Sequence, residues 1–178
     1  MTQPTVDEGE PHVLPVAGGR SGCPINMTAE LLGDRWSIVV LRDIMFGGHR
    51  RFRELLTNSV EGIASNILAA RLAKLTAAGL LSRHADPTHR QKVDYRLTEA
   101  AIQLVPVLAV LGDWGARWLP TTPELAVRAR VLADGGPAMW ERFMDELRAV
   151  HLHAEPGPED GVLTELTRAY QHAAGGEQ

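Results

Sequence analysis

The spacing of apolar residues predicts helices in the first part of the chain. Asn26 or Thr28 can cap a short helix over residues 29–32. A second helix is expected from Arg35 to the pair Gly47-Gly48, because two adjacent glycines stop a helix. Its residues are apolar on almost every side, which is typical of a helix buried at the centre of a core.

Two further helical segments lie close together in the sequence. A short amphipathic helix is expected over residues 51–58, followed by a tight turn at Ser59–Gly62. A longer helix begins near Ala64 and ends at Gly79. Its inward positions recur every three or four residues, at Ala64, Leu68, Leu72 and Leu75. Two short helices joined by a four-residue turn that contains glycine make a helix-turn-helix.

The period of the pattern changes from helix to strand after Gly79. Residues 80–85 and 93–97 read as strands, and in the second strand Val93, Tyr95 and Leu97 alternate with polar residues. The segment from Asp86 to Arg90 between them is a polar turn with a basic tip. A hairpin directly after a helix-turn-helix is the wing of a winged helix.

The rest of the chain is predicted to be helical. Thr98 can cap a helix that runs to about Leu119, and Pro106 should bend its first turns. Later helices are expected at 123–133, at 137–153 and in a short segment that ends near His172. The expected fold is therefore mainly α with a small β-hairpin wing: a winged helix-turn-helix with extra N- and C-terminal helices.

A length of 178 residues allows one good core with appended segments. Residues 1–22 mix Pro, Gly and acidic residues without a period and are expected to form a flexible arm. Residues 23–119 form the predicted DNA-binding and dimerisation domain, and residues 120–178 a helical acidic extension. No secretory signal is recognised, and no stretch approaches the roughly 20 apolar residues of a membrane span. The expected location is cytoplasmic, without a membrane partner.

The net charge of -4 is distributed unevenly along the chain. Residues 35–98 hold eleven basic and five acidic residues, or +6, and the remainder carries -10. A basic middle between acidic flanks suits a module that meets DNA phosphates in the middle of the chain. The charge also disfavours the alternative of a protein-interaction module that uses the fold without DNA.

The sequence offers little chemistry for catalysis or metal binding. No nucleophile and base pair, glycine-rich phosphate loop or carboxylate pair can be recognised, so no enzyme activity is expected. The single cysteine, Cys23, excludes an intrachain disulfide and a cysteine-built zinc site. His151 and His153 are two residues apart and would lie on different faces of a helix. Neither a metal nor a cofactor is therefore predicted.

Ordered fragments of the sequence resemble the HxlR-type winged-helix regulators, relatives of the MarR group. The match spans Gly22 to Leu119. Its fragments are Cys23-Pro24, residues 32–37 and 51–55, Gly62-Ile63, Leu68, Arg71-Leu72, Leu75, Gly79-Leu80, residues 93–98 and Trp114. These fragments in the right order are far more specific than a helix-turn-helix pattern alone. The resemblance implies a homodimeric transcription regulator whose terminal helices form the dimer interface.

The chain departs from this family pattern where the second helix of the motif begins. At the position of Ala64 family members usually carry Ser. They usually carry a basic residue at the position of Asn66, and Thr or Ser at that of Ala69. Without Ser at position 64 the helix loses a good N-cap, worth about 1 kcal/mol, unless Ser65 takes that role. The operator sequence therefore cannot be transferred from relatives.

The second helix of such a motif enters the major groove, so its outward side chains are candidates for base contacts. Asn66 could pair with adenine, and Ala69 or Ala70 could contact thymine methyl groups. Arg71 is equally compatible with a salt bridge or a DNA contact. The predicted phosphate contacts are Ser65, Lys74, Arg51, Arg53, His89, Arg90 and Lys92. The expected partner is a pseudo-palindromic double-stranded DNA operator bound by a homodimer.

The helix that runs to Leu119 is expected to form the dimer interface with the N-terminal helix near Leu31 and Leu32. The dimer residues on the longer helix are Leu111, Trp114 and Trp118. A pocket for a small-molecule effector near the two tryptophans is the alternative interpretation. In similar regulators the cysteine that matches Cys23 is a redox or electrophile sensor, and an inert structural cysteine is the alternative here.

Overall fold

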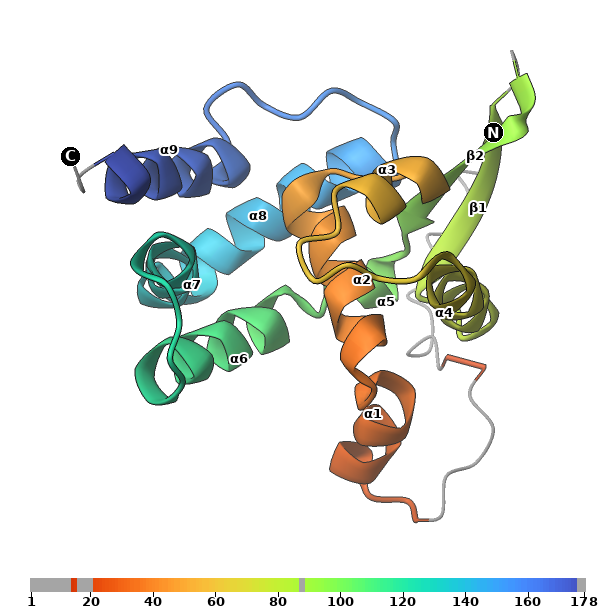
Figure 1. Ribbon diagram of the computed structural model, residues 1–178, viewed down its shortest axis with the longest axis horizontal. Coiled ribbons are helices and arrows are strands. Elements are labelled where there is room, and N and C mark those ends of the chain that lie inside the picture. The colour runs from red at the N-terminus through yellow and green to blue at the C-terminus, as the bar shows by residue number, and fades with distance from the viewer. Residues whose placement is uncertain (1–13, 16–20, 87–88, 176–178) are drawn as a thin grey trace, which may run out of the picture.

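The computed structural model describes residues 14–15, 21–86 and 89–175, except for the side chains of 86 and 89–91. Most of the arm expected at residues 1–22 lies outside this part of the chain. The elements are α1 (Pro24–Leu32), α2 (Arg35–Gly47), α3 (Phe52–Thr57), α4 (Ser65–Ala77), β1 (Leu81–Asp86), β2 (His89–Leu97), α5 (Glu99–Ile102), α6 (Val105–Trp118), α7 (Pro123–Asp134), α8 (Gly136–His151) and α9 (Val162–Gly175). The predicted mainly helical fold with a hairpin wing is confirmed (Figure 1).

Helices α2, α3 and α4 form the predicted helix-turn-helix region. The Asp34 carboxylate caps α2 by accepting a hydrogen bond from the Ser37 N–H at 3.0 Å. Gly48 ends α2 with φ 66, a left-handed conformation that favours glycine. Helix α4 begins at Ser65 after Ala64, which supplies no side-chain cap, so Ser65 does not take over the capping role.

The wing is longer than the sequence pattern predicted. Strand β2 begins at His89 rather than at Val93, and it pairs antiparallel with β1 from Leu81 opposite Leu97 outwards. A polar strand can extend beyond the alternating apolar part because ladder hydrogen bonds come from the backbone. Arg51, just before α3, forms an isolated antiparallel bridge with Asp94 of β2.

Two helices start or stop at other residues than expected. Helix α1 begins at Pro24, not near residue 29, because the missing proline N–H needs no partner in the first turn of a helix. The helix expected from Thr98 to Leu119 is two helices, α5 and α6. Pro106 is the reason, since it cannot donate the hydrogen bond that would continue α5 and its ring crowds the preceding turn. Thr98 donates its hydroxyl to the Gly79 carbonyl at 2.7 Å instead of capping α5.

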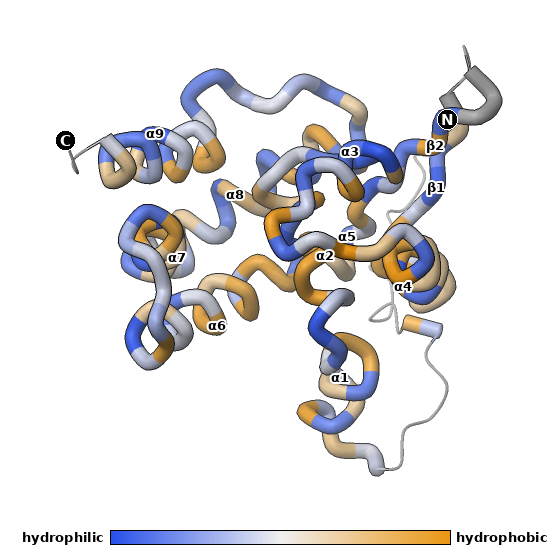
Figure 2. Tube along the Cα trace, in the orientation of Figure 1, coloured by the Kyte–Doolittle hydropathy of each residue, from blue (hydrophilic) through white to orange (hydrophobic). Residues whose placement is uncertain are grey.

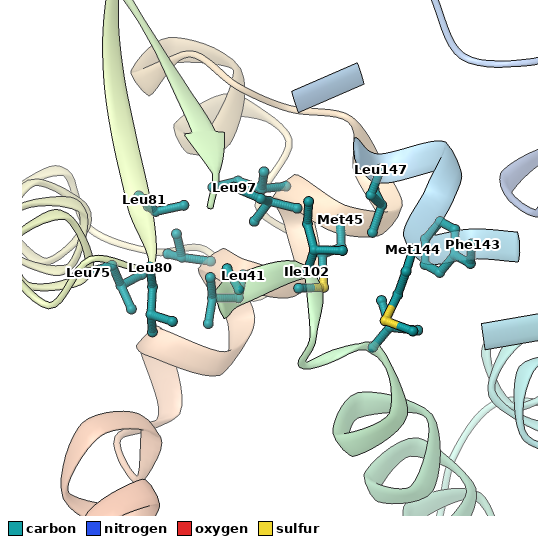
Figure 3. Close-up of a cluster of buried hydrophobic side chains, with 14 of the residues drawn as sticks. Leu41, Met45, Leu75, Leu80, Leu81, Leu97, Ile102, Phe143, Met144 and Leu147 are labelled. Carbon is teal, nitrogen blue, oxygen red and sulfur yellow. The ribbon is translucent and has the colours of Figure 1, made fainter. Parts of the chain in front are cut away.

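Helix α8, which follows the winged helix in the chain, packs into its core. Phe143 is fully buried, and its ring centroid lies 5.3 Å from that of Phe46 on α2. Met144 and Leu147 belong to the same hydrophobic cluster as Met45 of α2 (Figure 3). The segment expected as an appended extension therefore completes the main core.

His151 joins the end of α8 to the wing. Its side chain is only 4% exposed, and its Nδ1 accepts a hydrogen bond from the Leu97 N–H at 3.3 Å. Burial lowers the pKa of His151 to about 4, with a further contribution from Arg50 and Arg96. The buried imidazole is therefore neutral at pH 7 and can accept this hydrogen bond.

The opposite ends of the molecule carry different elements. Helix α4 and the β1–β2 hairpin lie together at one end, whereas α7 and α9 lie side by side at the other (Figure 1). The core of α2, α5 and α8 lies between them.

Candidate DNA-binding surface and subunit interface

Helix α4 turns a small, uncharged face to solvent. The exposed residues are Ser65, Asn66, Ala69, Ala70, Ala73 and Ala77, and the buried ones are Leu68, Leu72 and Leu75. No described residue is hydrogen-bonded to the Asn66 side chain, so its amide is available to an outside partner. The orientation is the one that the apolar spacing predicted, except that Ala64, which was expected to face inward, is exposed.

Asp34, at the start of α2, binds two basic side chains of α4. Its carboxylate lies 2.8 Å from Arg71 Nε and 2.9 Å from Lys74 Nζ, besides capping α2. Burial raises the pKa of Asp34, but the hydrogen bonds from Ser37 and Lys74 outweigh it and hold the pKa at about 2. Arg71 and Lys74, both candidate DNA contacts, are thus engaged in fixing α4 against α2.

The turn between α3 and α4 is fixed by a second ionic contact. Arg42 of α2 donates two hydrogen bonds to the Glu61 carboxylate, at 2.6 and 2.8 Å, and also pairs with Asp43 at 2.6 Å. The hydrogen bond from Arg42 lowers the pKa of Glu61, which therefore stays ionised at neutral pH. The Ser59 hydroxyl accepts from the Ile63 N–H at 3.1 Å and closes the turn.

The predicted phosphate contacts occur in different environments. Arg51 forms an ion pair with Asp94 of β2 at 2.9 Å and so ties α3 to the wing. Arg53 and Lys92 are exposed, and neither pairs with an acidic residue among those described. His89 and Arg90 belong to β2, but their side chains lie outside the described part of the chain.

Helix α6 is rich in hydrophobic residues (Figure 2), and several of its large apolar side chains are exposed. Leu111 is 45% exposed, Trp114 51% and Trp118 70%, and Val107 and Val110 are also exposed. The segment Glu99–Trp118 is long and apolar enough, by length and composition alone, to cross a membrane, so the expectation that no stretch of the sequence approaches a membrane span is wrong. Only 22% of its apolar window is buried.

The residues of the N-terminal helix α1 differ in exposure. Ile25 of α1 is 80% exposed and Leu31 is half-buried, whereas Leu32 belongs to the core of the protomer. Cys23 precedes α1 with an exposed free thiol. Among the described residues, no group of three or more potential metal ligands lies together.

Sequence reasoning missed the residues that position α4. Asp34 had a local signal, because an Asp three residues before Ser37 at a helix start is a common N-cap arrangement. The ion pairs of Asp34 with Arg71 and of Arg42 with Glu61 join positions far apart in the chain. No local pattern could have identified those partners.

The hairpin, the core and the exposed face of α4 define the class of the protein as a winged helix-turn-helix regulator that binds DNA. A model of the family described as HxlR-like helix-turn-helix matches residues 31–123. The chain therefore belongs to the HxlR-like helix-turn-helix family.

Individual relatives agree with this family. The uncharacterised HTH-type transcriptional regulator Rv3095 of Mycobacterium tuberculosis is 33% identical over 141 residues, which cover 77% of this chain and 87% of that protein. The HTH-type regulator sll1512 of Synechocystis sp. is 36% identical over 97 residues, which cover 54% of this chain and 70% of that protein. A similarity that covers 77% of the chain cannot end at residue 123, so the likeness to Rv3095 extends into the C-terminal helices.

A solved structure shows the same similarity. The crystal structure of PA1607, designated a candidate transcription factor, has a TM-score of 0.52 and 34% sequence identity. It covers 58% of this chain and 70% of that one.

Proposed function

We propose that this chain acts in the cytoplasm as a homodimeric transcription regulator that binds pseudo-palindromic duplex DNA. The observation that carries the proposal is the exposed face of α4, which Asp34 holds against α2. Arg53 on α3 and Lys92 on β2 are exposed cations that pair with no acidic residue among those described. A helix held in this way can enter the major groove, while flanking cations meet phosphates.

The residues on the α4 face favour a particular mode of recognition. Asn66 has the geometry to bond the N6 and N7 edge of adenine, and the methyl groups of Ala69 and Ala70 suit contact with thymine methyls. Arg71 and Lys74 are already paired with Asp34, so they contribute mainly to the position of the helix. We therefore expect direct readout to prefer A·T pairs.

Two variants separate reading of bases from binding of phosphates. Asn66→Ala should cost about 1 to 3 kcal/mol on the cognate site and relax the preference at one base pair. Lys92→Ala should weaken binding to all sequences alike and reduce the salt dependence. The measurement is affinity for fragments selected from genomic DNA and for random duplex. Equal losses on both DNAs for Asn66→Ala would remove Asn66 from the reading face.

The apolar face of α6 supports a dimer. Val107, Val110, Leu111, Trp114 and Trp118 form an exposed surface that a second copy can cover, together with Ile25 of α1. Trp114→Glu should give a folded monomer in sedimentation, whereas Gln171→Glu on the exposed side of α9 should leave the dimer intact. A folded Trp114→Glu variant that stays dimeric would locate the interface elsewhere.

Cys23 is proposed as a redox or electrophile sensor of the dimer. Its thiol is exposed and lies next to α1, so a bulky adduct or an intersubunit disulfide would displace this helix. The test compares DNA affinity of wild type and Cys23→Ser before and after treatment with diamide or a quinone. Unchanged wild-type affinity after demonstrated modification of Cys23 would end the sensor proposal.

A further inference from the structure

A largely apolar pocket of about 450 Å³ lies between the DNA-binding elements and the C-terminal helices. Its walls come from α2, the α3–α4 turn, α6, α7 and α9, which are far apart in sequence. The volume is within the range of pockets that bind small organic molecules. The apolar lining includes Ile38, Phe46, Leu108, Leu125, Leu132 and Leu166.

Among the described residues that line the pocket, Arg128 is an arginine without an acidic partner. Arg42, Asp43 and Glu61 also line it, but the two carboxylates are both engaged by Arg42. Arg128 of α7 pairs with no carboxylate among the described residues, and its buried Nε has no hydrogen-bond partner there. Its guanidinium carbon lies 4.3 Å from the centroid of the Tyr170 ring, so the ring holds the planar group in place.

A guanidinium that lines an apolar pocket and pairs with no carboxylate among the described residues keeps N–H donors for a ligand. A carboxylate offers Arg the strongest complement, because it accepts charge-assisted hydrogen bonds. We propose that the pocket binds a small molecule with an apolar body and one carboxylate or similar monoanionic group, the anion pairing with Arg128.

The same pocket is connected to the DNA-binding face. Glu61, which lines it, lies in the turn just before α4 and is fixed by Arg42 of α2. A ligand that fits one arrangement of these walls better than another would bias the position of α4 and so change DNA affinity. This regulatory consequence rests on the proposed function, whereas the binding of the ligand does not.

The test uses two fluorescent probes that differ in charge, anilinonaphthalenesulfonate and its neutral analogue phenylnaphthylamine, with the full-length protein. One saturable site per chain is expected for each probe. Arg128→Gln should raise the Kd of the sulfonate about tenfold or more and change that of the neutral probe less than twofold. Arg168→Gln, an exposed arginine on α9 paired with Asp160, is the charge-matched control and should change neither. Leu125→Gln should weaken both probes alike.

Several results would overturn the proposal. One is an unchanged Kd of the sulfonate for Arg128→Gln, which would place the probe elsewhere, for instance on the apolar face of α6. Another is loss of probe binding as protein concentration rises through the dimerisation range, which would mean that a second copy fills the pocket. DNA affinity is measured in parallel with and without the sulfonate. Probe binding without any DNA binding would contradict the proposed function alone, and an unchanged DNA affinity would contradict the regulatory link alone.

Discussion

Asp34 connects two helices through one carboxylate. It caps α2 through Ser37 and pairs with Arg71 and Lys74 on α4, so the position of the candidate reading helix depends on a residue outside that helix. Its pKa of about 2 means that the charged form is the one that the fold stabilises.

Asp34→Asn should destabilise the protein by about 1 kcal/mol at pH 7, because it weakens the cap and removes the charge that faces two cations. The folded-state pKa of Asp34 is depressed, so its contribution is complete above the unfolded value near 3.8 and is lost as pH falls towards 2. Urea unfolding at pH 7 and at pH 3 measures the unfolding free energy of wild type and variant. The difference in unfolding free energy between them should be smaller at pH 3. Asp160→Asn, at an exposed position, should show no such difference at either pH.

His151 predicts a second pH dependence at higher pH. Its folded-state pKa of about 4 lies below the ordinary value of 6.5, so stability is complete above pH 6.5 and falls as pH drops towards 4. The loss should reach about 3 kcal/mol and then level off. His151→Gln should flatten the fall in unfolding free energy between pH 7 and pH 5, whereas the exposed His172→Gln should not. The same slope in His151→Gln and wild type would contradict the assignment.

The local sequence explains the start of α4 and the break between α5 and α6. Helix α4 begins at Ser65, after the N-cap residue Ala64, whose φ of -72 and ψ of 145 suit a capping residue although its side chain cannot cap. Helices α5 and α6 are separated at Gln103 and Leu104, just before Pro106 in the first turn of α6, and Leu104 has φ -81 and ψ -4. The first of these features suggests a stabilising substitution.

Ala64→Ser should stabilise the protein by about 1 kcal/mol, because its hydroxyl can accept a hydrogen bond from an N–H in the first turn of α4. For a chain of this size the midpoint of thermal unfolding should rise by about 2 to 4 °C. Ala69→Ser, in the exposed interior of the same helix, gives no cap and should not raise it. A fall in the midpoint for Ala64→Ser would show that the first turn already has partners for its N–H groups.

Local sequence patterns were enough to predict most helices and strands and the side of α4 that faces outward. Apolar spacing placed Leu68, Leu72 and Leu75 inside, and the alternating strand residues identified the wing. The sequence could not show which side chains meet across the fold. The insertion of Phe143 beside Phe46, the ion pairs of Asp34 and the pocket at Arg128 all join distant parts of the chain. Such contacts depend on packing between elements, which no single periodicity records.

At the scale of the molecule, the C-terminal helices and the winged helix share one core. Phe143, Met144 and Leu147 of α8 lie among the side chains of α2 and α5 (Figure 3). Arg148 adds ionic contacts to Glu99 of α5, the shortest at 2.9 Å. Residues beyond the family match should therefore unfold together with the DNA-binding elements.

Phe143→Ala should lower the unfolding free energy by about 3 to 5 kcal/mol, because it leaves a cavity against Phe46 in the shared core. Near-UV circular dichroism, which follows aromatic packing, and far-UV circular dichroism, which follows helix content, should show one common transition. Leu152→Ala, at a site that is 42% exposed just after α8, should cost less than 1 kcal/mol. Two separate transitions would mean that the C-terminal helices form an independent unit.

The most direct test of the account is the salt dependence of affinity for the best fragment selected from genomic DNA by the purified protein. If α4 reads bases while cations such as Arg53 and Lys92 neutralise phosphates, log K should fall linearly with log salt concentration. A dimer that makes about six phosphate contacts should lose about a thousandfold in affinity between 50 and 200 mM salt, and random duplex should bind more weakly throughout. An affinity that barely changes with salt, or that is equal for selected and random DNA, would contradict the account.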